Sequence, residues 1–227
     1  MAKYKFSDVE EYFLKKRDVL KELLATGKKF EAALLALCYI DALGNLFLEG
    51  NTGKNRFLNL LFSYGTVDTF RWDKVNLAEF KKVEKNVSLA CNICPTCYEK
   101  VKLYVEQRIC EYDYSYSSKC LEKDKNLSEV IRDIIEISRE KVCKCNVISE
   151  PLLRCLYDAT YGGILYKKYR CESVHEAKFS ELWSSIGEHF EEPFYMDIDG
   201  ELPHFSITPE FIIETLDQCL INLQRKK

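Results

Sequence analysis

Glycine and proline are scarce in this chain, with 9 Gly and 5 Pro among 227 residues. A fold of many short strands needs a turn after each strand, and these two residues are the strongest turn formers. Hydrophobic residues make up 47% of the chain and charged residues 30%, a balance that excludes an intrinsically disordered protein. The length is enough for one domain with a proper core. We therefore predict a single, mostly α-helical bundle over residues 1–227.

Apolar residues at helical spacing, together with capping signals, predict where the helices lie. Capping boxes begin at Ser7 and Ser173, and Gly27 is placed to stop the first helix. The helix that runs toward Arg170 contains Gly162-Gly163, which can kink it or allow close packing. The predicted helices span residues 7–26, 28–49, 54–64, 76–86, 98–108, 128–139, 149–170, 173–190 and 208–223.

Two short apolar stretches predict a small β-hairpin near the C-terminus. Phe194 to Ile198 and Leu202 to Ile207 flank Asp199-Gly200, a dipeptide favoured in tight hairpin turns. Residues 87–126, by contrast, are rich in cysteine and show no clear period. We expect them to form an irregular, cysteine-rich insertion in the helical domain.

The apolar segments of the chain favour a cytoplasmic protein with no membrane partner. The longest apolar run, Ala32 to Ile40, ends at Asp41 and is shorter than the roughly 20 residues that a membrane span needs. The first residues lack the apolar core of a signal peptide.

Asp41 interrupts the most apolar helix, and a buried carboxylate needs partners. For Asp41 we favour a hydrogen bond across a helix interface over a place in a functional site.

Cysteine is unusually frequent, with 11 residues. In a cytosolic chain these are expected to be thiols or metal ligands rather than disulfides. Cys91, Cys94 and Cys97, with Pro95 between them, could present three thiolates to zinc or iron. The alternative, which we favour, is that they are small thiols packed between helices. A fourth ligand could come from Cys110, Cys120, Cys143 or Cys145.

Arg170 and His175 are the best candidates for chemistry. Ser173 is a predicted N-cap, so His175 falls in the first turn of the next helix, where free amides and the helix dipole suit an anion. An arginine offers phosphate a bidentate fork, and a histidine can move protons near neutral pH. The pair is suited to RNA cleavage without metal. The alternative is that both are ordinary surface cations beside Glu172 and Glu176.

The stretch Arg170-Cys171-Glu172-Ser173-Val174-His175 resembles the R-x4-H signature of HEPN-domain proteins. Residues 31–49 followed by 55–64 are similar to the leading helix pair of prokaryotic members. Members of this family are all-helical, commonly dimeric, and many are metal-independent ribonucleases of toxin–antitoxin or other defence systems. The resemblance implies a HEPN-like domain over residues 1–227, catalytic roles for Arg170 and His175, and no cofactor for catalysis. In active members the position after the arginine is often Asn, Asp or His, whereas here it is Cys171.

The net charge of −3 is not that of a protein that wraps nucleic acid, so any RNA contact must use a local patch. Lys167 and Lys168, beside Arg170, are the expected RNA-binding residues. One hypothesis is thus a metal-independent endoribonuclease for single-stranded RNA. It would be a homodimer that brings two Arg170 motifs together. The alternative is a non-catalytic helical module that binds a protein or a nucleotide, with a structural metal at the cysteine cluster.

Overall fold

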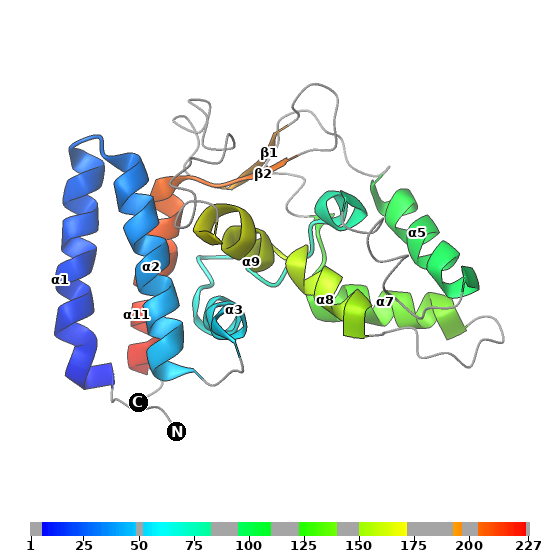
Figure 1. Cartoon of the computed structure of the whole chain (residues 1–227), viewed down its shortest axis with the longest axis horizontal. Helices are drawn as coiled ribbons and strands as arrows, with labels where there is room; N and C mark the ends of the chain where they lie inside the picture. Colours follow the sequence, from blue (N-terminus) through cyan, green and yellow to red (C-terminus); the bar gives the residue numbers. More distant parts are fainter. Residues whose placement is uncertain are drawn as a thin grey trace. The chain divides into compact units, whose positions relative to one another are not determined.

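The computed structural model of the chain describes residues 6–48, 52–82, 95–109, 123–139, 150–171, 193–196 and 204–225. These residues are mostly α-helical (Figure 1). Strands β1 (Phe194–Met196) and β2 (His204–Ser206) pair as a small antiparallel hairpin near the C-terminus. The predicted fold class, a mostly helical protein with a late hairpin, is confirmed.

The chain divides into two compact units. The first contains Met1–Trp72, Ile164–Pro193 and Ser206–Lys227. The second contains Asp73–Gly163 and Phe194–Phe205, and so includes the segment 87–126. Within that segment α5 (Pro95–Ile109) is helical, as expected for residues 98–108. Most of its other residues lie outside the described part of the chain, so the irregular insertion and the single domain stay predictions.

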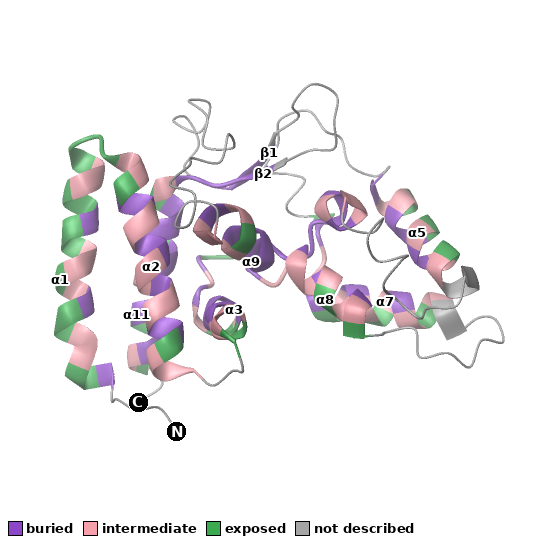
Figure 2. Cartoon of the chain, in the orientation of Figure 1, coloured by how far each residue is buried: buried purple, intermediate pink, exposed green. Residues whose placement is uncertain are grey.

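Helix α2 (Lys29–Phe47) lies at the centre of the first unit. It packs against α1 (Phe6–Ala25), α3 (Gly53–Tyr64) and α11 (Pro209–Arg225). Figure 2 shows α2 mostly buried or half-buried and α1 more exposed. By length and composition α2 is the one described helix that could cross a membrane, but core helices pass the same test. Its buried residues are Ala32, Ala33, Ala36, Leu37, Ile40, Leu43 and Gly44.

The connection between α1 and α2 depends on Gly27. This residue has a φ of +77°, a left-handed conformation that glycine adopts without steric cost. The Lys28 amide donates to the Leu23 carbonyl at 2.9 Å, which closes the helix C-terminus as a Schellman motif does. The predicted stop is therefore confirmed. The predicted start is wrong by one residue or more, because α1 already includes Phe6 and the Ser7 hydroxyl donates to the Asp8 carboxylate.

Side-chain caps fix the beginnings of several other helices. The Thr208 hydroxyl accepts from the Phe211 amide at 3.2 Å at the start of α11, and residue 208 is also where the last predicted helix begins. Thr52 accepts from the Asn55 amide at 3.1 Å at the start of α3. These caps explain why the observed helices begin close to the predicted positions.

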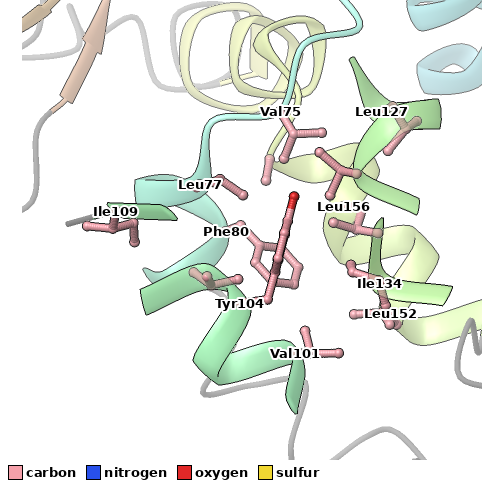
Figure 3. Packing of buried hydrophobic residues seen from close by; sticks show 13 residues of the cluster. Val75, Leu77, Phe80, Val101, Tyr104, Ile109, Leu127, Ile134, Leu152 and Leu156 are labelled. Atoms are coloured by element: carbon pink, nitrogen blue, oxygen red, sulfur yellow. The ribbon is translucent and has the colours of Figure 1, made fainter. Parts of the chain in front are cut away.

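The second unit is built around its own apolar core (Figure 3). Residues 77–82 form a helix, and α5 is joined by α7 (Leu127–Arg139) and α8 (Glu150–Asp158). Figure 3 shows the side chains of these elements pointing toward one another. The cluster consists of Val75, Leu77, Phe80, Val101, Tyr104, Val105, Ile109, Leu127, Val130, Ile134, Leu152, Leu156 and Ala159.

The long helix predicted over 149–170 is wrong as a single element. Helix α8 ends at Asp158, and Thr160 forms a β-bridge with Val75. The chain then turns into the short helix α9 (Tyr161–Ile164). The Thr160 hydroxyl accepts from the Gly163 amide at 3.0 Å, as an N-cap does. A Cβ at Gly163 would lie 2.1 Å from the Tyr157 carbonyl oxygen, so the break requires glycine there.

Candidate functional site

Arg170 lies in a segment of π-helix, η1 (Leu165–Cys171), which follows α9 directly. π-helical turns are rare and occur frequently at functional sites. Leu165 and Tyr169 are buried in the first unit, whereas Tyr166 and Arg170 are half-buried. The local winding therefore presents one tyrosine and one arginine together at the edge of the core.

An ion pair joins Arg170 to Asp41 on α2. The distance from Arg170 Nη2 to Asp41 Oδ2 is 2.8 Å, and the two side chains are 20% and 15% exposed. The carboxylate in the apolar helix thus has the hydrogen bond across a helix interface that the sequence indicates. Burial alone would lower the pKa of Arg170, but attraction to Asp41 and hydrogen bonds to Cys171 and Asp41 outweigh it and raise the pKa.

Tyr166 supports the same guanidinium from a second side. The Arg170 Cζ atom lies 5.4 Å from the centroid of the Tyr166 ring, a cation–π contact. The Tyr166 ring in turn packs against Phe57 of α3, with centroids 5.2 Å apart. Burial raises the pKa of Tyr166. Three elements, α2, α3 and η1, therefore fix the position of one arginine.

Two thiols lie next to the ion pair. Arg170 Nη1 approaches Cys171 Sγ at 3.9 Å, a weak contact. Cys38, one turn before Asp41 on α2, is half-buried. Burial raises the pKa of Cys38, and the nearby charge of Arg170 offsets this only in part. Cys38 is therefore a neutral thiol at pH 7, so its sulfur adds no negative charge beside Arg170.

Among the described residues, two buried polar atoms of the ion pair have no hydrogen-bond partner: Arg170 Nε and Asp41 Oδ1. Buried polar groups in native proteins are nearly always paired, and each exception needs an explanation. The single bond between Nη2 and Oδ2 uses only part of what a fork and a carboxylate can form. The described groups thus orient Arg170 and Asp41 but use only part of their hydrogen-bonding capacity.

No family model, curated protein or solved structure matches this chain. We therefore infer a function from the geometry at Arg170 and from the R-x4-H resemblance.

The structure places some of the predicted site residues and not others. Arg170, Lys167 and Lys168 all lie on η1, with Lys167 exposed and Lys168 half-buried. His175 lies outside the described residues, so its position relative to Arg170 stays a prediction.

Asp41 and Tyr166 are the contacts of Arg170 that sequence reasoning did not assign to the site. The signal for Asp41 was a lone carboxylate in an apolar helix.

The metal hypothesis for Cys91, Cys94 and Cys97 stays a prediction. Cys91 and Cys94 are outside the described residues, and only the backbone of Cys97 is described, at the start of α5. Within the described ranges, no group of three His, Cys, Asp or Glu side chains could hold a metal ion. The described free thiols are Cys38, Cys155, Cys171 and Cys219, of which Cys219 is fully buried on α11.

Proposed function

We propose that this protein is a metal-independent endoribonuclease for single-stranded RNA, in which Arg170 binds the scissile phosphate. The observation that carries the proposal is the way Arg170 is held. Asp41 fixes one end of its guanidinium, Tyr166 lies against it, and a fifth of the side chain still faces solvent. An oriented, partly exposed arginine is what recognition of a phosphate needs.

Orientation by Asp41 gives Arg170 a catalytic advantage. A guanidinium that is already in position does not lose side-chain entropy or reorganise when charge develops on the phosphate. Nη2 is engaged by Asp41, whereas the described contact of Nη1 is the weak one to Cys171. A phosphate oxygen can replace that sulfur contact with a charge-assisted hydrogen bond. Lys167, exposed on the same segment, adds positive potential on an acidic protein.

His175 supplies the proton transfer in this proposal, as the R-x4-H resemblance implies. It takes the proton from the ribose 2′-hydroxyl, or gives one to the leaving 5′-oxygen. The 2′-oxygen bonds to phosphorus while the bond to the 5′-oxygen breaks, which leaves a 2′,3′-cyclic phosphate. The nucleophile belongs to the RNA itself, so DNA cannot react. The same resemblance supports a defence or toxin role, and the short apolar runs of the sequence support a cytoplasmic location.

A non-catalytic role has one observation in its favour. The half-buried pair of Arg170 and Asp41 also ties η1 to α2, and such a pair can be purely structural. In that case the protein would be a helical module that binds a protein or a nucleotide. Cleavage of RNA separates the two functions.

The test is incubation of the purified full chain with single-stranded RNA and with DNA of the same sequence, in excess chelator. We expect RNA to be cut slowly to cyclic-phosphate ends, identified by mass spectrometry, and DNA to stay intact. His175→Ala should slow cleavage by about a hundredfold to ten-thousandfold, because it removes the proton transfer. His204→Ala, at the first residue of β2, is the matched control. Equal cleavage by the unaltered chain and His175→Ala would identify the activity as contamination and leave the binding module.

A further inference from the structure

The π-helical winding of η1 brings Tyr166 and Cys171 onto one face. In a π-helix residues i and i+5 stand in the relation that i and i+4 have in an α-helix, whereas in an α-helix five residues correspond to about 140° of rotation. Tyr166, Arg170 and Cys171 are all half-buried, so each of them is partly open to solvent. The winding therefore gathers a phenol, a guanidinium and a thiol at one place on the surface of the first unit.

Two hydrogen-bond donors of this group meet at the sulfur of Cys171. Arg170 Nη1 approaches Sγ at 3.9 Å. Burial is the main reason that the pKa of Tyr166 is raised, and a hydrogen bond with the Cys171 side chain contributes to the rise. A hydrogen bond that raises the pKa of a phenol favours its neutral form, so the Tyr166 hydroxyl is the donor. One sulfur atom thus accepts from both the guanidinium and the phenol.

The place of that sulfur suits an anionic oxygen better than it suits a thiol. Sulfur is a weak acceptor, whereas a phosphate oxygen forms short, charge-assisted hydrogen bonds. A phosphate reaches Arg170 most easily at Nη1, because Nη2 is bound to Asp41 and Nε is buried. An oxygen that displaces the sulfur from Nη1 also comes within reach of the Tyr166 hydroxyl, since both donors are directed at the same atom.

Two contacts hold the phenol ring in place before any substrate arrives. The Tyr166 ring packs on Phe57 of α3, and its centroid lies 5.4 Å from Arg170 Cζ. A donor that is already in position does not reorganise when charge develops in the transition state. Because its pKa is raised, the phenol keeps its proton at neutral pH and serves as a donor and not as a base.

We propose that Tyr166 is a catalytic residue whose hydroxyl donates a hydrogen bond to the non-bridging phosphate oxygen that Arg170 Nη1 binds. This inference rests on the proposed ribonuclease function and adds a second donor to the same site. The hydrogen bond strengthens as negative charge grows on the phosphate oxygens during attack by the 2′-oxygen, so it increases the rate more than the affinity for RNA. Tyr166 transfers no proton, and His175 keeps that role.

The test compares Tyr166→Phe with the unaltered chain in single-turnover cleavage of RNA in excess chelator. Phenylalanine keeps the ring against Phe57 and Arg170 and removes only the hydroxyl. Cleavage should slow by about a hundredfold or more, the effect of removing one donor to a developing oxyanion. The affinity for an uncleavable 2′-O-methyl RNA should change little. Tyr12→Phe, which removes an exposed hydroxyl from α1, is the matched control and should change neither, and thermal unfolding checks the fold of both variants.

An RNA with sulfur in place of one non-bridging oxygen at its main cleavage site gives a readout that a structural role of the hydroxyl would not change. Sulfur is the weaker acceptor, so the unaltered chain should cleave one of the two diastereomers more slowly than ordinary RNA. In Tyr166→Phe this slowing should be smaller, because one of the two affected hydrogen bonds is already absent. Equal rates for ordinary RNA and both diastereomers in the unaltered chain would overturn the inference without any variant.

Cys171→Ala separates a direct contact with phosphate from an effect made through the sulfur. If Tyr166 only held Cys171 in place, Tyr166→Phe would have no effect in a chain that already carries Cys171→Ala. We expect about the same loss of rate there as in the unaltered background, and no loss would contradict the direct contact.

The outcomes separate this inference from the proposed function. If the unaltered chain and Tyr166→Phe cleave RNA at the same rate while Arg170→Lys does not cleave it, the role of Tyr166 is wrong and the ribonuclease proposal stands. A loss of RNA affinity as large as the loss of rate would also contradict the inference, because the hydroxyl would then act in binding. If the unaltered chain cleaves no RNA, both are overturned.

Discussion

The charge of Arg170 is the least variable property of the site. Its pKa is raised above an already high value, so it stays protonated at every pH at which a protein of this kind is folded. Any change of activity with pH near neutrality must therefore come from another group. In the proposed mechanism that group is His175, because histidine is the side chain that ordinarily changes charge near neutral pH.

We expect Asp41→Asn to destabilise the first unit and to leave the guanidinium of Arg170 less firmly held in position. The amide keeps the shape of the carboxylate but cannot neutralise a half-buried guanidinium, and a hydrogen bond to a charged group contributes about 1.5–3 kcal/mol. The measurement is a double-mutant cycle with Arg170→Gln, in which urea unfolding gives the free energy of unfolding of each variant. We expect a coupling energy of about 1 kcal/mol or more. Additive effects of the two substitutions would show that the pair does not form in solution.

At the scale of elements, the crossing of α2 and α3 depends on Gly44. We expect Gly44→Ala to cost about 1–3 kcal/mol of unfolding free energy, because its Cβ would lie 2.9 Å from the Arg56 carbonyl oxygen and force the helices apart. Gly53→Ala is the control, since a Cβ there meets nothing within 4 Å. Denaturant unfolding of both variants checks this. Equal stability of the two would mean that α2 and α3 are not in backbone contact.

In the second unit, Asp133 links α7 to α5 through a hydrogen bond whose strength depends on pH. It accepts from Tyr104 at 2.9 Å and from Lys125 Nζ at 2.7 Å. Burial alone would raise the pKa of Asp133, but these hydrogen bonds outweigh it and lower the pKa. A lowered pKa in the folded state stabilises above the pKa of the unfolded carboxyl, and that stabilisation is lost as pH falls through the folded value.

We therefore expect Asp133→Asn to lower the unfolding free energy at pH 7 by about 1.5–3 kcal/mol, the usual worth of a hydrogen bond to a charged group. The difference from the unaltered chain should shrink as pH falls below about 4, the usual range of an unfolded aspartate. Urea titrations at a series of pH values measure it. Glu136→Gln, at an exposed position of the same helix, is the control. A difference that stays constant into acid would contradict the charge-based explanation.

At the scale of the whole molecule, we expect a symmetric homodimer that brings two Arg170 motifs together. A two-fold axis would double the cations of a sparse site on an acidic protein. Light scattering at micromolar concentration measures the mass, and cross-linking through a cysteine placed at Lys167 reports whether the motifs meet. A monomer, or a dimer that does not cross-link there, would contradict this arrangement.

The state of the cysteine cluster is a separate prediction for the whole chain. We expect Cys91, Cys94 and Cys97 to be free thiols that matter for folding and not for chemistry. Elemental analysis of the purified protein decides this. Stoichiometric zinc or iron would show instead that the cluster is a structural metal site, and chelation should then lower stability.

Local signals in the sequence predicted most of the fold, and distant contacts explain what they did not predict. Helix α11 begins where Thr208 caps it, and α1 ends just before Gly27, because both signals act within one turn. The break before α9 depends on the pairing of Thr160 with Val75, which are far apart in the chain. The partner of Arg170 is likewise 129 residues away, so the motif indicated the arginine but not Asp41.

In the proposed mechanism Arg170 acts through the planar fork that Asp41 and Tyr166 hold in place. The most direct test is the single-turnover rate of RNA cleavage by Arg170→Lys in excess chelator, compared with the unaltered chain. Lysine keeps the charge but cannot form the bidentate contact. We predict loss of most of the activity, with the thermal stability of the variant checked in parallel. A folded Arg170→Lys that cleaves RNA at the unaltered rate would show that the reaction does not need the planar guanidinium.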